Sequence, residues 1–212
     1  MIKKVIAVLS CLSIVFAFSA CKDDEKSSDS SKTTTTTTEA AAKETNEETN
    51  TKYEVETTAA KDNNAKIVDG VIDNPNYTIE VGDNWDLSSG GDTMVFLDKK
   101  GENAGNSSEN ISIMFTDEFA NMPVDECVSS FKAQYEGIEG YKVISAEAIK
   151  IGDYDASEIV LNATVAETTI KNKQVCIIGE KGGALIVYTA LEDIYEKGVS
   201  DFDKILETIK LK

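Results

Sequence analysis

Apolar and polar residues alternate along much of the chain after residue 65, and this period of two predicts β-strands. In the first such stretch Tyr77, Ile79 and Val81 alternate with Thr78 and Glu80. Similar patterns predict further strands at 94–97, 111–115, 141–146, 148–151, 156–166, 168–180 and 184–191. The polar, Gly- and Asn-rich stretch 99–109 predicts a loop, and the glycine pair 182–183 predicts a turn before the last strand.

A first helix is predicted to start near Pro123, which suits the first helical position. Asp125 and Glu126 then fall in the first turn, where they complement the helix dipole, and Gly137 ends the helix. The residues that share one apolar stripe are Val124, Cys127, Val128, Phe131 and Tyr135.

A second helix is predicted to begin at Ser200, which with Asp203 makes a Ser-x-x-Asp pattern similar to a capping box. Its apolar stripe consists of Phe202, Ile205, Leu206 and Ile209. Many strands with one central and one terminal helix predict an α+β domain over residues 66–212, built on a largely antiparallel sheet flanked by helices.

The N-terminus has the features of a secretory signal. Lys3 and Lys4 precede an apolar stretch at 5–20, which is shorter than the roughly 20 residues of a membrane span. Ser19 and Ala20 then lead to Cys21, after which the sequence becomes polar at once. We therefore expect a signal peptide at 1–20.

These residues resemble the lipobox of bacterial lipoproteins, with Phe18 where that motif usually has Leu. The resemblance implies that Cys21 carries a diacylglycerol and becomes the new N-terminus. Two acyl chains give stable anchoring where one gives only marginal binding. An ordinary secretory signal and an uncleaved anchor are the alternatives. The expected location is the outer face of the bacterial cytoplasmic membrane, with the membrane as partner through Cys21.

Residues 21–65 comprise Cys21 and a segment made mostly of Thr, Glu, Lys, Ser, Asp, Asn and Ala. Tyr53 and Val55 are its only sizeable apolar residues. Such a segment buries too little apolar surface to offset the entropy lost on ordering. We expect a disordered tether that holds the domain away from the membrane.

Several short motifs resemble the PsbP-like α/β/α sandwich superfamily, which includes DcrB-like bacterial lipoproteins. They are the strand that runs into Gly82 and Trp85, the strand 110–115, the helix from Pro123, the unit 148–159 around Gly152, and the terminal helix 202–209. A proline common before the Gly-Trp element in this superfamily is absent here. The resemblance implies an α/β/α sandwich and, since most members are non-catalytic binding or assembly factors, a chain that is not an enzyme.

Composition narrows the function further. The chain has 38 acidic and 21 basic residues, a formal net charge of −17, no His and no Arg. Such a chain is a poor partner for a phosphate backbone, so we expect no nucleic-acid binding. The absence of His removes the commonest general base and metal ligand. No motif predicts a cofactor, a metal site or a catalytic residue.

Four groups of residues are candidates for a functional role, and each also has a purely structural interpretation. Trp85 is a ligand platform or a core residue. Ser129 and Lys132 form an S-x-x-K pair without its companion motifs, and Ser129 is predicted to face water. Two acidic sets are candidate Ca²⁺ loops or plain surface charge, although neither has EF-hand spacing. These sets are Asp83, Asp86 and Asp92, and Asp153, Asp155 and Glu158.

Cys127 and Cys176 are predicted to be buried, one on the helix stripe and the other in a strand. Two buried thiols and a helix-to-sheet disulfide in an oxidising exterior are both open, because spacing alone does not give the Cα separation.

The favoured function is a membrane-anchored, extracytoplasmic, non-catalytic binding or assembly module of the cell envelope, with an envelope protein or glycan as its partner. A cell-envelope hydrolase that uses carboxylates alone is the alternative, and a structural spacer is a third hypothesis.

Overall fold

The computed structural model describes residues 65–101, 108–165 and 167–212. The predicted signal peptide, Cys21 and the tether up to residue 64 lie outside these residues, as does the middle of the predicted 99–109 loop. In the part that is described, no helix is long and apolar enough to cross a membrane.

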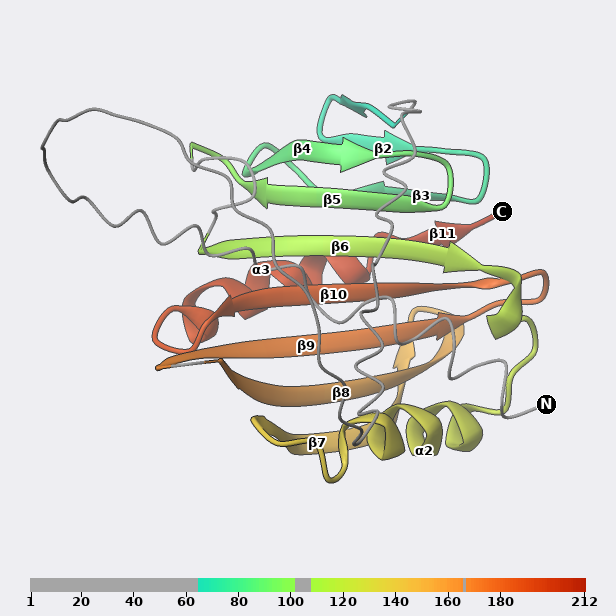
Figure 1. Cartoon of the computed structure of the whole chain (residues 1–212). Coiled ribbons are helices and arrows are strands. Elements are labelled where there is room, and N and C mark those ends of the chain that lie inside the picture. The colour runs from blue at the N-terminus through green and yellow to red at the C-terminus, as the bar shows by residue number, and fades with distance from the viewer. Residues whose placement is uncertain (1–64, 102–107, 166) are drawn as a thin grey trace, which may run out of the picture. The chain divides into compact units, whose positions relative to one another are not determined.

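A seven-stranded antiparallel sheet forms the centre of the domain, in the order β4-β5-β6-β10-β9-β8-β7 (Figure 1). Its strands are β4 Trp85–Gly90, β5 Met94–Lys99, β6 Glu109–Thr116, β7 Tyr141–Ile151, β8 Tyr154–Val165, β9 Thr168–Ile178 and β10 Gly183–Leu191. The outermost strands, β4 and β7, each contain a register shift, between Leu87 and Ser89 and between Val143 and Ser145.

A smaller antiparallel sheet has the order β1-β2-β3-β11. It consists of β1 Ile67–Val68, β2 Val71–Asp73, β3 Tyr77–Glu80 and the C-terminal β11 Lys210–Leu211. Strand β11 therefore lies beside β3, the first strand that the sequence pattern predicted.

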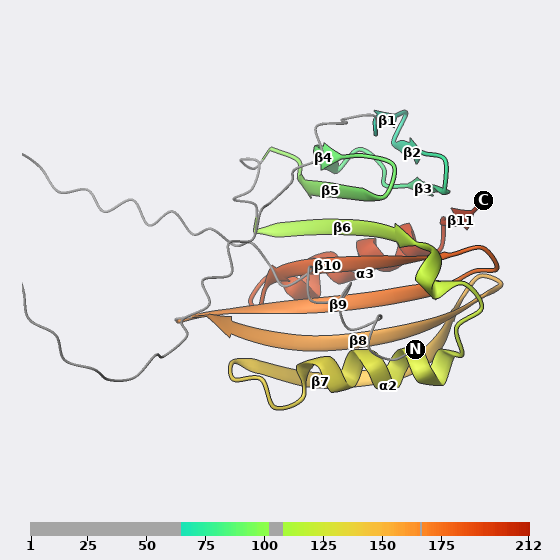
Figure 2. The same ribbon diagram turned by 45° about the vertical axis from the view of Figure 1, so that its right-hand side comes forward.

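Two helices lie on opposite faces of the large sheet, α2 Val124–Tyr135 and α3 Tyr195–Leu206 (Figures 1 and 2). A short 3-10 turn, η2 Asp117–Phe119, precedes α2. The α+β class, the antiparallel sheet and the helix on each face are thereby confirmed.

Strand β10 shows why the sheet is covered on both faces. Its residues from Gly183 to Ala190 are all buried, as expected for a central strand with a continuous apolar run. Ile186 and Tyr188 point into the core under α3, whereas Leu185 and Val187 point into the core under α2. Burial of such large side chains contributes roughly 1.5–3 kcal/mol each.

Two predictions about strands need correction. Residues 141–146 and 148–151 form one strand, β7, rather than two, because Ala146, Glu147 and Ala148 pair without interruption with β8 across the predicted break. The pattern also missed β1, β2, β4 and β11, of which three are only two or three residues long.

The predicted start of the second helix at Ser200 is wrong. Helix α3 begins five residues earlier, at Tyr195, and its N-cap, Ile194, makes no side-chain capping bond. Asp203 instead pairs with Lys173 of β9 at 2.8 Å. Gly198 lets this earlier part of α3 pack closely on the sheet, because a Cβ there would lie 2.1 Å from the Tyr188 hydroxyl. Ile209 lies beyond the helix, although it is buried as predicted.

Helix α2 differs less from its prediction. It begins at Val124, so Pro123 occupies the N-cap rather than the first helical position. Cys127 and Phe131 are buried, and Val124, Val128 and Tyr135 are partly buried, which confirms the predicted stripe.

Candidate functional site

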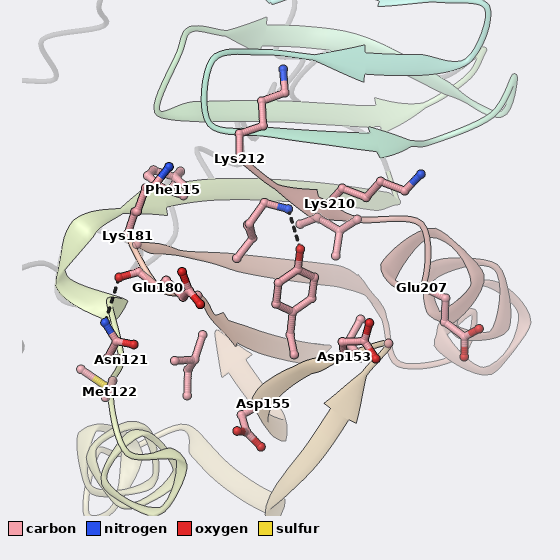
Figure 3. A pocket seen from close by; sticks show the side chains of 18 residues that line it. Phe115, Asn121, Met122, Asp153, Asp155, Glu180, Lys181, Glu207, Lys210 and Lys212 are labelled. Carbon is pink, nitrogen blue, oxygen red and sulfur yellow. Dashed lines mark hydrogen bonds between the residues drawn. The ribbon is translucent and has the colours of Figure 1, made fainter.

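A cavity of about 790 Å³ opens where two hairpin turns of the large sheet meet the C-terminal strand (Figure 3). The β7–β8 turn contributes Gly152 and Asp153, and the β9–β10 turn contributes residues 179–182. The segment between η2 and α2 adds Asn121 and Met122. The last residues of the chain, from Ile209 to Lys212, close the remaining side.

The side of the cavity formed by the β9–β10 turn is held by main-chain packing. Gly179 and Gly182 are close to each other, because a Cβ on Gly179 would lie 2.5 Å from the Gly182 carbonyl oxygen. Asn121 adopts a positive φ of 51° and is fastened to this turn by two bonds. Its main-chain N–H donates to the Gly179 carbonyl and its side-chain amide to the Glu180 carbonyl, both at 2.8 Å.

The opposite side is held by Tyr154. Strand β11 pairs with β3 on one edge, so the N–H of Leu211 points away from that ladder. The Tyr154 hydroxyl accepts this N–H at 3.1 Å. The bond ties the C-terminal strand to the β7–β8 hairpin.

The cavity combines an apolar lining with a charged rim. The apolar side chains come from Phe115, Met122, Ile151, Ile178, Ile209 and Leu211. The charged side chains, all labelled in Figure 3, belong to Asp153, Asp155, Glu180, Lys181, Glu207, Lys210 and Lys212.

Two of the rim charges are already engaged. Asp155 pairs with Lys150 at 2.8 Å, and the Lys212 ammonium contacts the Asp73 carboxylate and the Asn74 carbonyl. Within the described ranges, the remaining five rim charges make no side-chain ion pair: Asp153, Glu180, Lys181, Glu207 and Lys210. The rim thus presents charges of both signs to an incoming molecule.

The structure separates the members of the first acidic set. Asp83 precedes β4, Asp86 lies within it, and Asp92 follows at its other end. Since a strand rises about 3.3 Å per residue, the six residues of β4 keep Asp92 far from the other two.

The second acidic set is divided between two faces of the sheet. Asp153 and Asp155 line the cavity, whereas Glu158 pairs with Lys173 at 2.8 Å on the side of α3. No group of three His, Cys, Asp or Glu side chains within the described residues is placed to hold a metal ion.

The remaining candidates have structural roles. Trp85 is buried in the core and meets Tyr188 edge-to-face at 6.5 Å, with the Lys99 ammonium 5.0 Å from its ring centroid. Ser129 is exposed and donates back to the Asp125 carbonyl at 2.8 Å, while Lys132 pairs with Glu136. The solvated face predicted for Ser129 is confirmed.

Cys127 and Cys176 are both buried thiols, on α2 and β9 respectively. The sulfur of Cys127 lies 3.1 Å from the Ser157 hydroxyl. Both cysteines belong to the core between α2 and the sheet.

The sequence did not point to Asn121, Glu180, Lys181 or Lys210 as site residues. The only local signal was the Glu-Lys-Gly-Gly turn at 180–183, of which the glycine pair predicted a turn and nothing more. These residues come together only through the fold.

No protein-family model matches the sequence, and no curated protein matches it. Several solved structures are similar in fold. A crystal structure from Bacteroides thetaiotaomicron VPI-5482 is 10% identical with a TM-score of 0.49. That match covers 64% of this chain but only 45% of the other, so this chain spans less than half of that protein's length.

Two further structures are similar over a larger share of their own length. The solution structure of cyanobacterial PsbP from Synechocystis sp. PCC 6803 is 13% identical, with a TM-score of 0.46 and coverage of 64% of this chain and 86% of that one. LpqN, involved in cell envelope biogenesis of Mycobacterium tuberculosis, is 14% identical, with a TM-score of 0.48 and coverage of 64% and 83%.

Proposed function

We propose that the chain is a membrane-anchored, extracytoplasmic lipoprotein whose C-terminal domain is a non-catalytic binding module of the cell envelope. The observation that carries the binding role is the cavity between the two hairpin turns and β11, with its apolar lining and rim charges of both signs that form no ion pair among the described residues. Ligand sites are typically concave and largely apolar, with a few polar groups that fix orientation.

The chemistry of the rim favours a peptide segment over a neutral glycan as ligand. Lys181 and Lys210 offer ammonium groups to carboxylates, while Asp153, Glu180 and Glu207 offer carboxylates to ammonium groups. The apolar lining accommodates an aliphatic side chain between them. A short peptide of an envelope protein or of the cell wall carries all three kinds of group.

The binding role is tested by charge reversal on the rim. Lys181→Glu and Lys210→Glu should each weaken binding of an acidic-apolar peptide several-fold, since a rim charge contributes about 1 kcal/mol. Lys197→Glu makes the same change of charge at an exposed position of α3 that is not part of the cavity lining. Titration calorimetry with a panel of cell-wall peptides and synthetic peptides of both charges provides the measurement. Equal peptide affinities of the wild type and all three variants, or no binding of any peptide in the panel, would contradict the proposal that the cavity is the binding site.

The hydrolase alternative gains no support from the cavity. All four of its carboxylates are exposed, whereas a carboxyl that acts as a general acid near neutral pH is usually buried against apolar groups. Incubation with cell-wall fragments, glycans and model esters should therefore give no turnover. Turnover that co-purifies with the protein and disappears in the Asp153→Asn variant would show that the domain is an enzyme and would overturn the proposed binding role.

The anchor is a separate proposal with a separate test. Replacement of Cys21 by Ala removes the atom that would carry the lipid, so the variant should leave the membrane fraction while the wild type stays. Equal retention of both proteins in the membrane fraction would contradict lipid attachment at Cys21 and would leave the cavity experiment unaffected.

A further inference from the structure

Cys127 and Cys176 come from different layers of the domain and meet in its interior. Cys127 lies in the second turn of α2 and is 0% exposed; Cys176 lies in β9 and is 1% exposed. Ser157 of β8 is the cross-strand partner of Cys176. Side chains directly opposite each other on antiparallel strands have Cβ atoms roughly 4.5–5.5 Å apart. The Cys127 sulfur lies 3.1 Å from the Ser157 hydroxyl and within hydrogen-bonding reach of the Cys176 thiol.

The two thiols are chemically unequal. The hydrogen bond from Cys176 holds the pKa of Cys127 below its usual range, against the opposing effect of burial, and the Ser157 hydroxyl adds to the lowering. Burial raises the pKa of the Cys176 thiol well above its usual range. The thiolate is the nucleophile in disulfide exchange, so Cys127 is the attacking member of the pair.

We propose that Cys127 and Cys176 form a disulfide that fastens helix α2 to the central sheet when the domain folds in an oxidising compartment. That such a compartment surrounds the domain rests on the proposed extracytoplasmic location, since disulfides persist outside the reducing cytosol. The pairing itself rests on the geometry of α2, β8 and β9.

The oxidant is the disulfide of a thiol–disulfide oxidoreductase or of a small molecule. As α2 docks, the Cys127 thiolate attacks one sulfur of that disulfide, forms a mixed disulfide and releases one thiol of the acceptor. The Cys176 sulfur, once deprotonated, then attacks the Cys127 sulfur and releases the second thiol. Two protons and two electrons leave the cysteine pair, one sulfur–sulfur bond forms here, and the acceptor is reduced to two thiols.

The bond would also fix one wall of the cavity. Helix α2 follows directly on Asn121 and Met122, which line that wall, and Cys127 is five residues beyond Met122. The bond would close a loop of about 50 residues, a length at which cross-linking strongly restricts the unfolded chain.

The test uses the full-length protein, refolded either with oxidised glutathione or with dithiothreitol. After an acid quench, trypsin releases the two cysteines in separate peptides, 101–132 and 174–181. We expect a linked pair lighter than the sum of the two peptides by two hydrogen masses in the oxidised sample, and free thiols in the reduced one. Reduction should lower the Tm by about 10 °C. Cys176→Ala is the matched control, because its Tm should not respond to dithiothreitol.

Refolded, oxidised protein in which both peptides carry glutathione or free thiols would overturn the pairing. The same peptides from protein isolated from cells under an acid quench then test the compartment separately. A pair that links in vitro but is reduced in cells would contradict the extracytoplasmic location and would leave the geometry standing.

Discussion

Gly198→Ala is expected to destabilise the domain, although the same change usually stabilises a helix. Gly198 lies inside α3 and is buried against the ring of Tyr188. An ideal Cβ at this position would meet the Tyr188 hydroxyl at 2.1 Å, Glu109 Oε2 at 2.8 Å and the Tyr188 Cζ at 3.1 Å. The glycine is therefore needed for close approach of α3 to the sheet.

The ring of Tyr188 has little freedom to move away from an added methyl group. It stacks on Phe202 at 5.4 Å, packs on Tyr195 at 5.5 Å and meets Trp85 edge-to-face. Overpacking of a rigid core costs about 3 kcal/mol at the upper end of its usual range. Alanine returns about 1 kcal/mol of helix propensity. The net loss should be about 2 kcal/mol, or a fall in Tm of about 5 °C.

Urea unfolding followed by fluorescence suits the measurement, because Trp85 is the only tryptophan and is buried. Ser200→Ala, at an exposed position of the same helix, should change stability by less than about 0.5 kcal/mol. Tyr188→Phe removes the oxygen nearest to the methyl group, so Gly198→Ala should cost less in that background, and the double-mutant cycle should show a coupling of about 1 kcal/mol. A Gly198→Ala protein as stable as the wild type, or an equal loss in both backgrounds, would refute this account of the packing.

Three further predictions concern charge and the tether. Lys173→Met should lower the free energy of unfolding by about 2–3 kcal/mol, because it leaves the largely buried Glu158 carboxylate unpaired. Lys204→Met should lower it by under about 0.5 kcal/mol, since the pair of Lys204 with Asp201 is exposed. Chemical denaturation compares the two variants. Burial raises the pKa values of Tyr77, Tyr188 and Tyr195. Above about pH 10 the unfolded chain therefore binds fewer protons than the folded domain, so thermal stability should fall as the pH rises, and a flat profile from pH 9 to 11 would contradict this. A chain that begins at residue 60 should match the full chain in Tm to within about 3 °C, the effect of roughly 1 kcal/mol, as measured by calorimetry; a clearly lower Tm would show that the tether packs on the domain.

The sequence pattern located the elements with long, regular repeats. Helix α2 was predicted to within one residue, because Pro123 and the stripe through Cys127 and Phe131 depend only on local order. The start of α3 was missed because a glycine such as Gly198 argues against a helix in the sequence. Its role becomes clear only once the structure shows that it packs against Tyr188, ten residues earlier. The split predicted within β7 was wrong for a related reason, since the pairing of Glu147 with Glu158 that continues the strand depends on the neighbouring strand.

The cavity was beyond prediction for the same physical reason. Asn121, Glu180 and Lys210 are each separated by tens of residues, and nothing in their local sequences marks them as neighbours. Only the pairing of β3 with β11 and the two hairpins bring them to one rim. The cysteine pair was a partial success, because burial followed from periodicity while proximity required the register of β8 and β9.

The irregular edge strands of the large sheet affect whether many copies of the protein can lie close together without polymerising. A flat, regular edge is a template on which a second copy can add its own strand. Strands β4 and β7 form the two edges, and each is broken by its own register shift, which increases the local twist. Exposed Lys142, Glu147 and Lys150 add charge along β7 that a stacking copy would have to desolvate. Copies crowded onto one surface should therefore remain separate molecules rather than join edge to edge into fibres.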